Sequence, residues 1–198
     1  MNTLLSVIVP VYNQEKDIEA VINKANTIPV EKEIIVVNDC SKDNTESILR
    51  GLSLNSLKIV HHISSRGKAA AVRTGLENAA GEFVLVLDGD LGYAPSDYLK
   101  LLEAAKDPAV DIVLGARFSR MQQGVRVLKA KNYFLTAVLN IFFGVKLHDW
   151  FSRYQLIRRQ NLLELVLKSR SAEISFEILT KALRKKMRVI EVPVCDGQ

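Results

Sequence analysis

The first half of the chain alternates short apolar runs with longer stretches in which apolar residues recur at helical spacing. Leu5 to Pro10 is a mostly apolar run, and the stretch from Gln14 to Ile28 carries Ile18, Val21 and Ile22. A run without a polar face is typical of a strand buried on both sides, whereas recurrence every three to four positions predicts a helix. The pattern therefore predicts strands that are joined by helices, as in a parallel sheet.

The alternation continues to Gly115 and then becomes irregular. We expect strands over 5–10, 33–37, 57–60, 83–87 and 112–115, and helices over 14–28, 43–52, 69–80 and 95–105. In the remainder we expect helices over 125–143, 161–168 and 175–184 and strands over 154–157 and 189–192. This order predicts an α/β fold, a doubly wound, mostly parallel sheet in a single domain, which binds ligands at the carboxyl ends of its strands.

Two acids directly follow the most apolar of these strands. Phe83 to Leu87 is wholly apolar, and Asp88 and Asp90 come next with only Gly89 between them. Two carboxylates at the carboxyl end of a strand suit a divalent cation such as Mg²⁺ or Mn²⁺ that also holds a diphosphate. The alternative interpretation is a polar turn that only caps the strand.

Polar residues also follow the first two strands, so three sets of polar side chains would converge on one edge of the sheet. A nucleotide needs an aromatic or apolar contact for its base, an acid or amide for base edges and ribose hydroxyls, and a metal for its diphosphate. Tyr12, Asp39 and the acid pair could supply these in order. The segment from Asn38 to Asp43 is also explained by helix capping through Ser41 or Asp43, which accounts least well for Asp39.

The segment from Ser64 to Gly75 places a glycine and three basic residues around the start of a helix of small residues. The basic residues are Arg66, Lys68 and Arg73, and a helix start with such side chains favours an anion. The segment lacks the order of a phosphate-binding P-loop, and the chain has no G-x-G-x-x-G, which argues against P-loop ATPases and nicotinamide enzymes. A solvated basic helix face is the alternative.

The composition of the chain excludes only a few classes of binding partner and site. The formal charge of +5 favours an anionic partner but does not separate nucleotides, nucleic acids and phospholipid headgroups. Cys40 and Cys195 are the only cysteines, without C-x-x-C spacing, so neither a disulfide framework nor a zinc site is indicated. The amino terminus does not resemble a secretory signal, and we expect a cytoplasmic protein. Nucleic-acid binding is disfavoured because the basic residues are not interleaved with an aromatic stacking platform.

One long segment combines apolar character with positive charge. The apolar stretch from Tyr133 to Val145 is shorter than the roughly 20 residues that span a bilayer. From Ile112 to His148 there is no acidic residue, so the segment could lie against an anionic lipid surface or bind phosphates. An amphipathic core helix with a solvated basic edge is the alternative. The basic residues of the segment are Arg117, Arg120, Arg126, Lys129, Lys131 and Lys146.

Taken together, four sequence blocks resemble family 2 glycosyltransferases of the GT-A fold, the Rossmann-like fold of nucleotide-diphospho-sugar transferases. The blocks are residues 6–13, 34–45, 66–75 and 88–91. Three later blocks are most similar to the polyprenyl-phosphate branch, the dolichol-phosphate mannosyl- and glucosyltransferases. They are residues 115–118, 149–158 and 190–194.

The resemblance implies a role for individual residues. Asp88 and Asp90 would bind the metal, Mg²⁺ or Mn²⁺, and the diphosphate, and Arg117 would face the donor or the acceptor phosphate. Asp149 stands where relatives with hydroxyl acceptors would have a base. The residues implied in nucleotide-sugar binding are Pro10, Tyr12, Gln14, Asp39, Lys68 and Asp88.

The implied activity is inverting transfer of a hexose from a nucleoside diphosphate sugar, of the GDP-mannose or UDP-glucose type, to a polyprenyl phosphate. Such an acceptor is already an anion and attacks without a general base. Residues 1–115 would form the nucleotide-sugar half and residues 116–198 the acceptor half. The protein would work in peripheral contact with the cytosolic face of a membrane.

Three positions depart from the family pattern, and two other functions stay open. Gln14 replaces an acid, Gly92 replaces a glutamine and Arg153 replaces a glycine. One alternative is transfer to a sugar hydroxyl with Asp149 as base. The other is a nucleotide-sugar-binding module without turnover.

Overall fold

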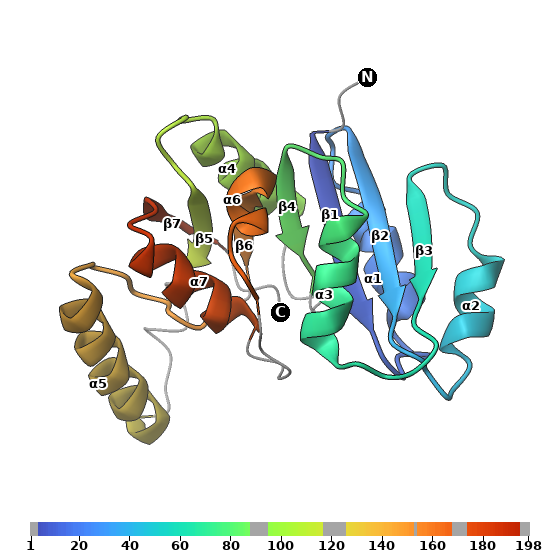
Figure 1. The fold of residues 1–198 in the computed structure, drawn as a ribbon, viewed down its shortest axis with the longest axis horizontal. Helices are drawn as coiled ribbons and strands as arrows, with labels where there is room; N and C mark the ends of the chain where they lie inside the picture. Colours follow the sequence, from blue (N-terminus) through green and yellow to red (C-terminus); the bar gives the residue numbers. More distant parts are fainter. Residues whose placement is uncertain (1–3, 88–94, 117–125, 153, 168–173, 195–198) are drawn as a thin grey trace.

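The protein folds around a seven-stranded sheet with the order β3-β2-β1-β4-β6-β5-β7 (Figure 1). The structure is a computed structural model and describes residues 4–87, 95–116, 126–152, 154–167 and 174–194. Most neighbouring strands are parallel, whereas β6 runs antiparallel to both β4 and β5. The strands are β1 (Leu5–Val11), β2 (Lys32–Asn38), β3 (Leu57–His61), β4 (Phe83–Val86), β5 (Ile112–Ala116), β6 (Gln155–Arg158) and β7 (Val189–Pro193).

Helices cover both faces of the sheet. Helices α1, α2 and α4 pack with one apolar cluster, and α3, α6 and α7 pack with the other, on the opposite face. The helices are α1 (Ile18–Asn26), α2 (Thr45–Gly51), α3 (Lys68–Glu77), α4 (Pro95–Ala105), α5 (Arg126–Phe143), α6 (Arg159–Leu163) and α7 (Ile174–Arg184).

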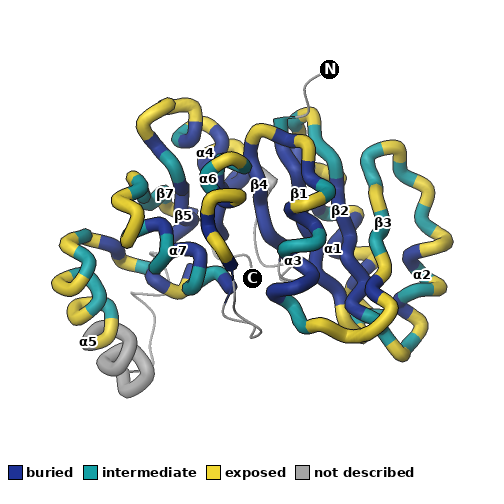
Figure 2. The backbone as a smooth tube through the Cα atoms, in the orientation of Figure 1, coloured by how far each residue is buried: buried dark blue, intermediate teal, exposed yellow. Residues whose placement is uncertain are grey.

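The central strands are buried on both faces, as their apolar runs predict. Every residue of β1 and β4 is buried (Figure 2). Along β1, Val7 and Val9 face the cluster with α1, while Ile8 faces the cluster with α3. This alternation follows from the two-residue period of a strand between two helical layers.

The predicted fold class and order of elements are confirmed, with differences at the ends and in one strand direction. Helix α1 begins at Ile18 rather than Gln14, and α3 ends at Glu77 rather than Ala80. The residues before α1 are engaged in loop contacts, described below. The antiparallel direction of β6 was not predicted, because hydrophobic periodicity carries no information on strand direction.

Candidate active site

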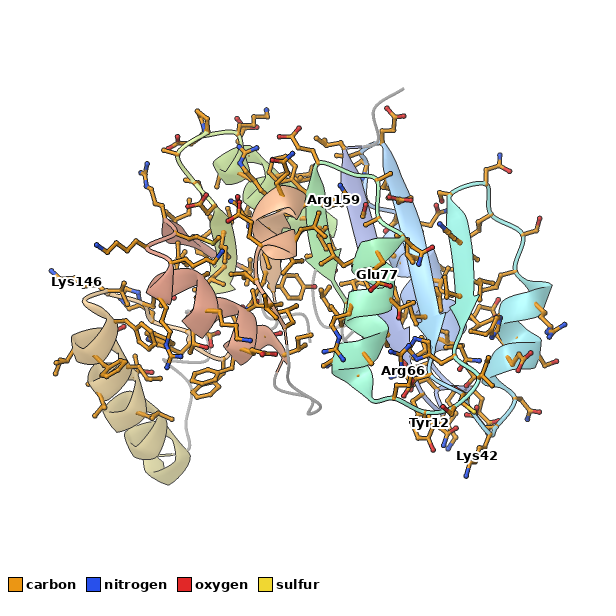
Figure 3. All side chains as sticks on the ribbon, in the orientation of Figure 1. Tyr12, Lys42, Arg66, Glu77, Lys146 and Arg159 are labelled. Atoms are coloured by element: carbon orange, nitrogen blue, oxygen red, sulfur yellow. The ribbon has the colours of Figure 1, made fainter. Side chains whose placement is uncertain are left out.

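The candidate site lies at the carboxyl edge of the sheet, where β1 and β2 end side by side. Parallel pairing places Val11 opposite Asn38 at these ends. The segments that follow, residues 12–17 and 39–44, form what we call the β1–β2 edge. Figure 3 shows Tyr12, Lys42 and Arg66 gathered at this edge of the sheet.

Hydrogen bonds join the two segments of the β1–β2 edge. The backbone N–H of Asn13 donates to Ser41 Oγ at 3.0 Å, and the Lys42 N–H donates to Asn13 Oδ1 at 2.8 Å. Asn13 adopts a positive φ of 51°, which asparagine tolerates better than most residues. The polar segments after the first two strands therefore converge, as predicted. Ser41 joins the two segments by accepting the Asn13 N–H and does not cap α2. Asp43 Oδ1 does accept the Thr45 N–H at 3.0 Å, at the start of α2.

The three candidate residues after β1 differ in exposure. Pro10 is buried within the strand, whereas the Tyr12 side chain is exposed at the edge. Gln14 is half-buried, and its N–H donates to Thr45 Oγ1 at 2.9 Å. Its side-chain Oε1 is buried and accepts no hydrogen bond from the part of the chain that the structure describes. The segment after β1 thus combines an exposed aromatic ring at Tyr12 with a buried side-chain acceptor at Gln14 that has no donor among the described residues.

Asp39, directly after β2, is buried, and its carboxylate accepts hydrogen bonds from four residues. The Arg66 N–H donates to both oxygens at 2.9 and 3.1 Å, and the Gly67 N–H donates to Oδ2 at 2.8 Å. Ser65 Oγ donates to Oδ2 at 2.8 Å, and His62 Nδ1 donates to Oδ1 at 2.6 Å. The carboxylate therefore ties the end of β2 to the segment that leads into α3.

These contacts also set the charge of Asp39. Burial by itself would raise the pKa of the carboxyl, but the hydrogen bonds from the backbone and side chains around it outweigh burial and lower the pKa below its ordinary value of 3.8. Asp39 is therefore an anion at neutral pH. In space it lies at the start of α3, where it bonds Gly67, the residue before Lys68. At this helix start the backbone N–H groups of Arg66 and Gly67 therefore already bind an anion of the protein itself.

His62 uses both ring nitrogens and so joins three elements. A carboxylate has no proton to donate, so Nδ1 carries the proton toward Asp39. Nε2 lies 2.9 Å from Thr74 Oγ1 on α3. The imidazole is buried, and its orientation is therefore fixed from both sides.

Asp149 lies on the turn between α5 and β6. It is half-buried, and its N–H donates to Glu191 Oε1 on β7 at 2.8 Å. Strand β6 runs antiparallel, so its amino end lies at the same edge of the sheet as the carboxyl ends of β4 and β5. This topology brings Asp149 to the edge that carries Tyr12 and Asp39.

The remaining candidates cannot be placed. Asp88, Asp90 and Arg117 lie outside the described residues, as do Gly92 and Arg153. Within the described part of the chain no group of three or more His, Cys, Asp or Glu side chains forms a metal site. The metal assignment thus stays a prediction from the sequence.

Sequence reasoning missed His62 and Glu191 as site residues. His62 directly follows β3, so its position at the carboxyl edge was a usable signal. Glu191 is a charged residue within the otherwise apolar strand Val189–Pro193, which is unusual for a strand packed in a sheet. His62 lies 23 residues from Asp39 and Glu191 lies 42 residues from Asp149, and spacing alone could not identify these pairs.

The chain is similar to known proteins across most of its length. The family model "Glycosyl transferase family 2" matches residues 6–173. A dolichol-phosphate mannosyltransferase of Pyrococcus furiosus is 28% identical over 98% of this chain and 56% of its own length. A polyprenol monophosphomannose synthase of Mycolicibacterium smegmatis is 27% identical over 95% of this chain and 75% of its own length. The chain thus spans little more than half of the Pyrococcus relative.

Solved structures share the fold. A mannosyltransferase from Pyrobaculum calidifontis, in complex with GDP-Man and Mn²⁺, superposes with a TM-score of 0.76 at 23% identity, over 98% of this chain and 56% of its own. A glucosyl-3-phosphoglycerate synthase from Mycobacterium tuberculosis, in complex with Mg²⁺ and UDP, gives 0.74 at 20% identity, over 98% and 70%. The matched family range includes the β1–β2 edge and the Asp149 turn on a GT-A fold, and the chain therefore belongs to glycosyl transferase family 2.

Proposed function

We propose that the protein is an inverting, metal-dependent glycosyltransferase that moves a hexose from a nucleoside diphosphate sugar to a polyprenyl phosphate. The observation that carries this proposal is the β1–β2 edge, where hydrogen bonds join the two loops and Tyr12 exposes its aromatic ring. Membership of the family supports the reaction class. The names of the two relatives described above support the acceptor class.

The nucleotide would bind across the β1–β2 edge. The Tyr12 ring offers a flat surface for the base, and the Gln14 side chain would hydrogen-bond a base edge or a ribose hydroxyl. Pro10 would contribute an apolar surface at the end of β1, where it is buried. Asp39 would act by holding the segment before α3 in place, because its oxygens already accept hydrogen bonds from that segment.

The diphosphate would be held by Asp88 and Asp90 through a divalent metal, with Lys68 at the start of α3 and Arg117 as cationic partners. The first 115 residues would thus form the donor half and the remainder the acceptor half. When bound, Mg²⁺ or Mn²⁺ would neutralise charge that develops on the diphosphate leaving group. GDP-mannose and UDP-glucose are the proposed donor types, since the structures with the same fold hold GDP-Man or UDP.

A phosphate acceptor changes what the protein has to supply. A polyprenyl phosphate is an anion at neutral pH and can attack the anomeric carbon directly, so a single displacement inverts the configuration there. Catalysis then depends on the alignment of the acceptor oxygen with the leaving group and on stabilisation of charge. No proton has to be removed from the nucleophile.

Helix α5 suits contact with a membrane surface. It projects from the body of the protein (Figure 1), and its described turns are largely exposed (Figure 2). Ile141 and Phe142 are 84% and 73% exposed, and Lys146 beyond them is also exposed. Apolar side chains flanked by a base favour the interface of an anionic bilayer. We therefore propose that α5 makes peripheral contact with a membrane, at the cytosolic face.

Among the described residues no helix is long and apolar enough to cross a membrane.

A transfer assay tests the proposed function. The protein is incubated with Mg²⁺ or Mn²⁺, a polyprenyl-phosphate extract of membranes and a panel of labelled nucleotide sugars, and label in the lipid phase is counted. Metal-dependent labelling from one donor is the expected result. If no donor labels lipid and none is hydrolysed, the proposal is wrong and a binding module without turnover replaces it.

A variant of Asp149 distinguishes transfer to a sugar hydroxyl, the alternative reaction, from transfer to a polyprenyl phosphate. A hydroxyl needs a base, so Asp149→Asn should abolish transfer to a hydroxyl. Transfer to a phosphate needs no base and should survive this isosteric change to a measurable degree. Comparison of the two acceptors with the same variant decides between them.

A further inference from the structure

The turn that carries Asp149 is held by a buried carboxylate on another strand. The Glu191 side chain is 8% exposed. Its Oε1 accepts the N–H groups of His148 and Asp149, both at 2.8 Å. Its Oε2 accepts the His148 N–H at 2.9 Å and His148 Nδ1–H at 2.8 Å. One carboxylate thus fixes the backbone of two consecutive residues.

The residues on either side of this pair are anchored independently. Leu147 and Trp150 are both buried. Asn140, near the end of α5, donates from Nδ2 to the Leu147 carbonyl at 2.9 Å. Its Oδ1 accepts the Leu147 N–H at 3.1 Å and Trp150 Nε1–H at 2.8 Å. The turn therefore consists of two anchored ends, with His148 and Asp149 between them.

Burying Glu191 costs free energy that must be offset. A carboxylate that loses water is stable only where hydrogen bonds or charges replace it. Here the replacements come from the turn itself, and bonds from N–H groups to a charged oxygen are stronger than neutral ones. Glu191 pairs in register with Leu114 on β5, so the fixed point belongs to the sheet. The Asp149 backbone is therefore held by a residue of the sheet and not by a surface loop.

We propose that Glu191 is a positioning residue for transfer, which sets where the Asp149 side chain stands relative to the donor half. This rests on the proposed function, in which Asp149 belongs to the acceptor side of the site. Glu191 itself makes no contact with substrate in this proposal. It acts through the backbone of His148 and Asp149.

Two variants of Glu191 separate hydrogen bonding from charge. Glu191→Gln keeps an acceptor oxygen for both N–H groups, and its amide can donate to the other tautomer of His148, so it should retain transfer. Glu191→Ala removes every bond to the turn. It should lower kcat on the order of 10- to 100-fold, because a shift of about 1 Å in a residue beside the reacting groups can cost about that much in alignment. The donor KM should hold within about twofold, because β1 and β2 lie in the other half of the sheet.

Glu33 provides a matched control. It is a part-buried carboxylate on β2 that accepts Ser6 Oγ–H at 2.6 Å and the N–H groups of Ala80 and Gly81 at 2.6 and 3.3 Å. It lies at the amino end of its strand, away from the site. Glu33→Ala should therefore lower stability and leave kcat of the remaining folded protein unchanged.

A double variant and an exchange measurement complete the test. If Glu191 acts through Asp149, Asp149→Ala with Glu191→Ala should be no slower than Asp149→Ala alone. Amide hydrogen exchange at residues 147–150 should be faster in Glu191→Ala and unchanged in Glu191→Gln. Additive losses of kcat, unchanged exchange in Glu191→Ala, or full activity of Asp149→Ala would each overturn the positioning role. A wild-type protein without transfer activity would instead overturn the proposed function, while the exchange result would still decide whether Glu191 holds the turn.

Discussion

At the scale of single residues, the hydrogen bonds of Asp39 explain why the residue directly after β2 is an acid. Its carboxylate accepts hydrogen bonds from the segment that leads into α3, including the backbone N–H groups of Arg66 and Gly67. An amide at this position would turn one NH₂ group toward those donors. The residue therefore organises the edge at which the nucleotide is proposed to bind.

Asp39→Asn should lower the free energy of unfolding by about 2 kcal/mol, because its NH₂ group replaces an oxygen that accepts part-buried N–H groups. Urea denaturation at neutral pH measures the change. Ser65→Ala serves as the control, since it removes one neutral donor to the same carboxylate and should cost about 1 kcal/mol. Equal stability of Asp39→Asn and the wild type would show that these hydrogen bonds do not hold the edge.

The lowered pKa of Asp39 also predicts how this contribution varies with pH. A carboxyl with a folded pKa below its unfolded value of 3.8 stabilises the fold fully at higher pH, and the contribution is lost as pH falls through the folded pKa. The gap in unfolding free energy between wild type and Asp39→Asn should thus be constant near neutrality and should narrow below pH 3.8. Urea melts across this range measure the gap. A gap that widens toward acid would contradict the assigned sign.

At the scale of elements, Gly75 sets how closely α3 approaches β1. A Cβ at Gly75 would lie 2.4 Å from Ile8 Cγ2, and Ile8 is fully buried in the strand. Branching at Cβ keeps the isoleucine from swinging aside. The small residue is therefore required by packing in the layer that covers the sheet.

Gly75→Ala should destabilise the protein by about 1–3 kcal/mol, because overpacking outweighs the gain of about 1 kcal/mol in helix propensity. Gly51→Ala at the end of α2 is the matched control, since nothing lies within 4 Å of its added Cβ. That variant should be neutral or slightly more stable. Thermal or urea unfolding distinguishes the two, and an equal effect of both changes would contradict the close packing of α3 on β1.

Helix α5 carries the prediction for membrane contact. Replacing Ile141 and Phe142 together by Asp should weaken binding to anionic vesicles by at least about 100-fold, since burial of each side chain is worth about 1.5–3 kcal/mol. Co-sedimentation with vesicles measures the change. Leu163→Asp on α6 is the control, because Leu163 is also exposed but belongs to a different helix. An equal loss from the control, or none from the pair, would remove α5 as the contact.

At the scale of the whole molecule, the order of elements could be predicted because two-face burial and helical spacing leave direct marks on the sequence. The meeting of the segments after β1 and β2 could be predicted as well, since Tyr12 and Asp39 each follow a strand. Their partners could not. Asp39 is satisfied by His62 and the segment after it, and Asp149 is held by Glu191, contacts that exist only once distant strands lie side by side.

The measurement that tests the central claim most directly uses purified protein, one labelled nucleotide sugar and two acceptors that differ only in the phosphate. We expect metal-dependent transfer to the polyprenyl phosphate and none to the matching polyprenol, because only the phosphate is an anion that can attack without a base. Transfer to the polyprenol, or to free sugars in place of the polyprenyl phosphate, would contradict this claim.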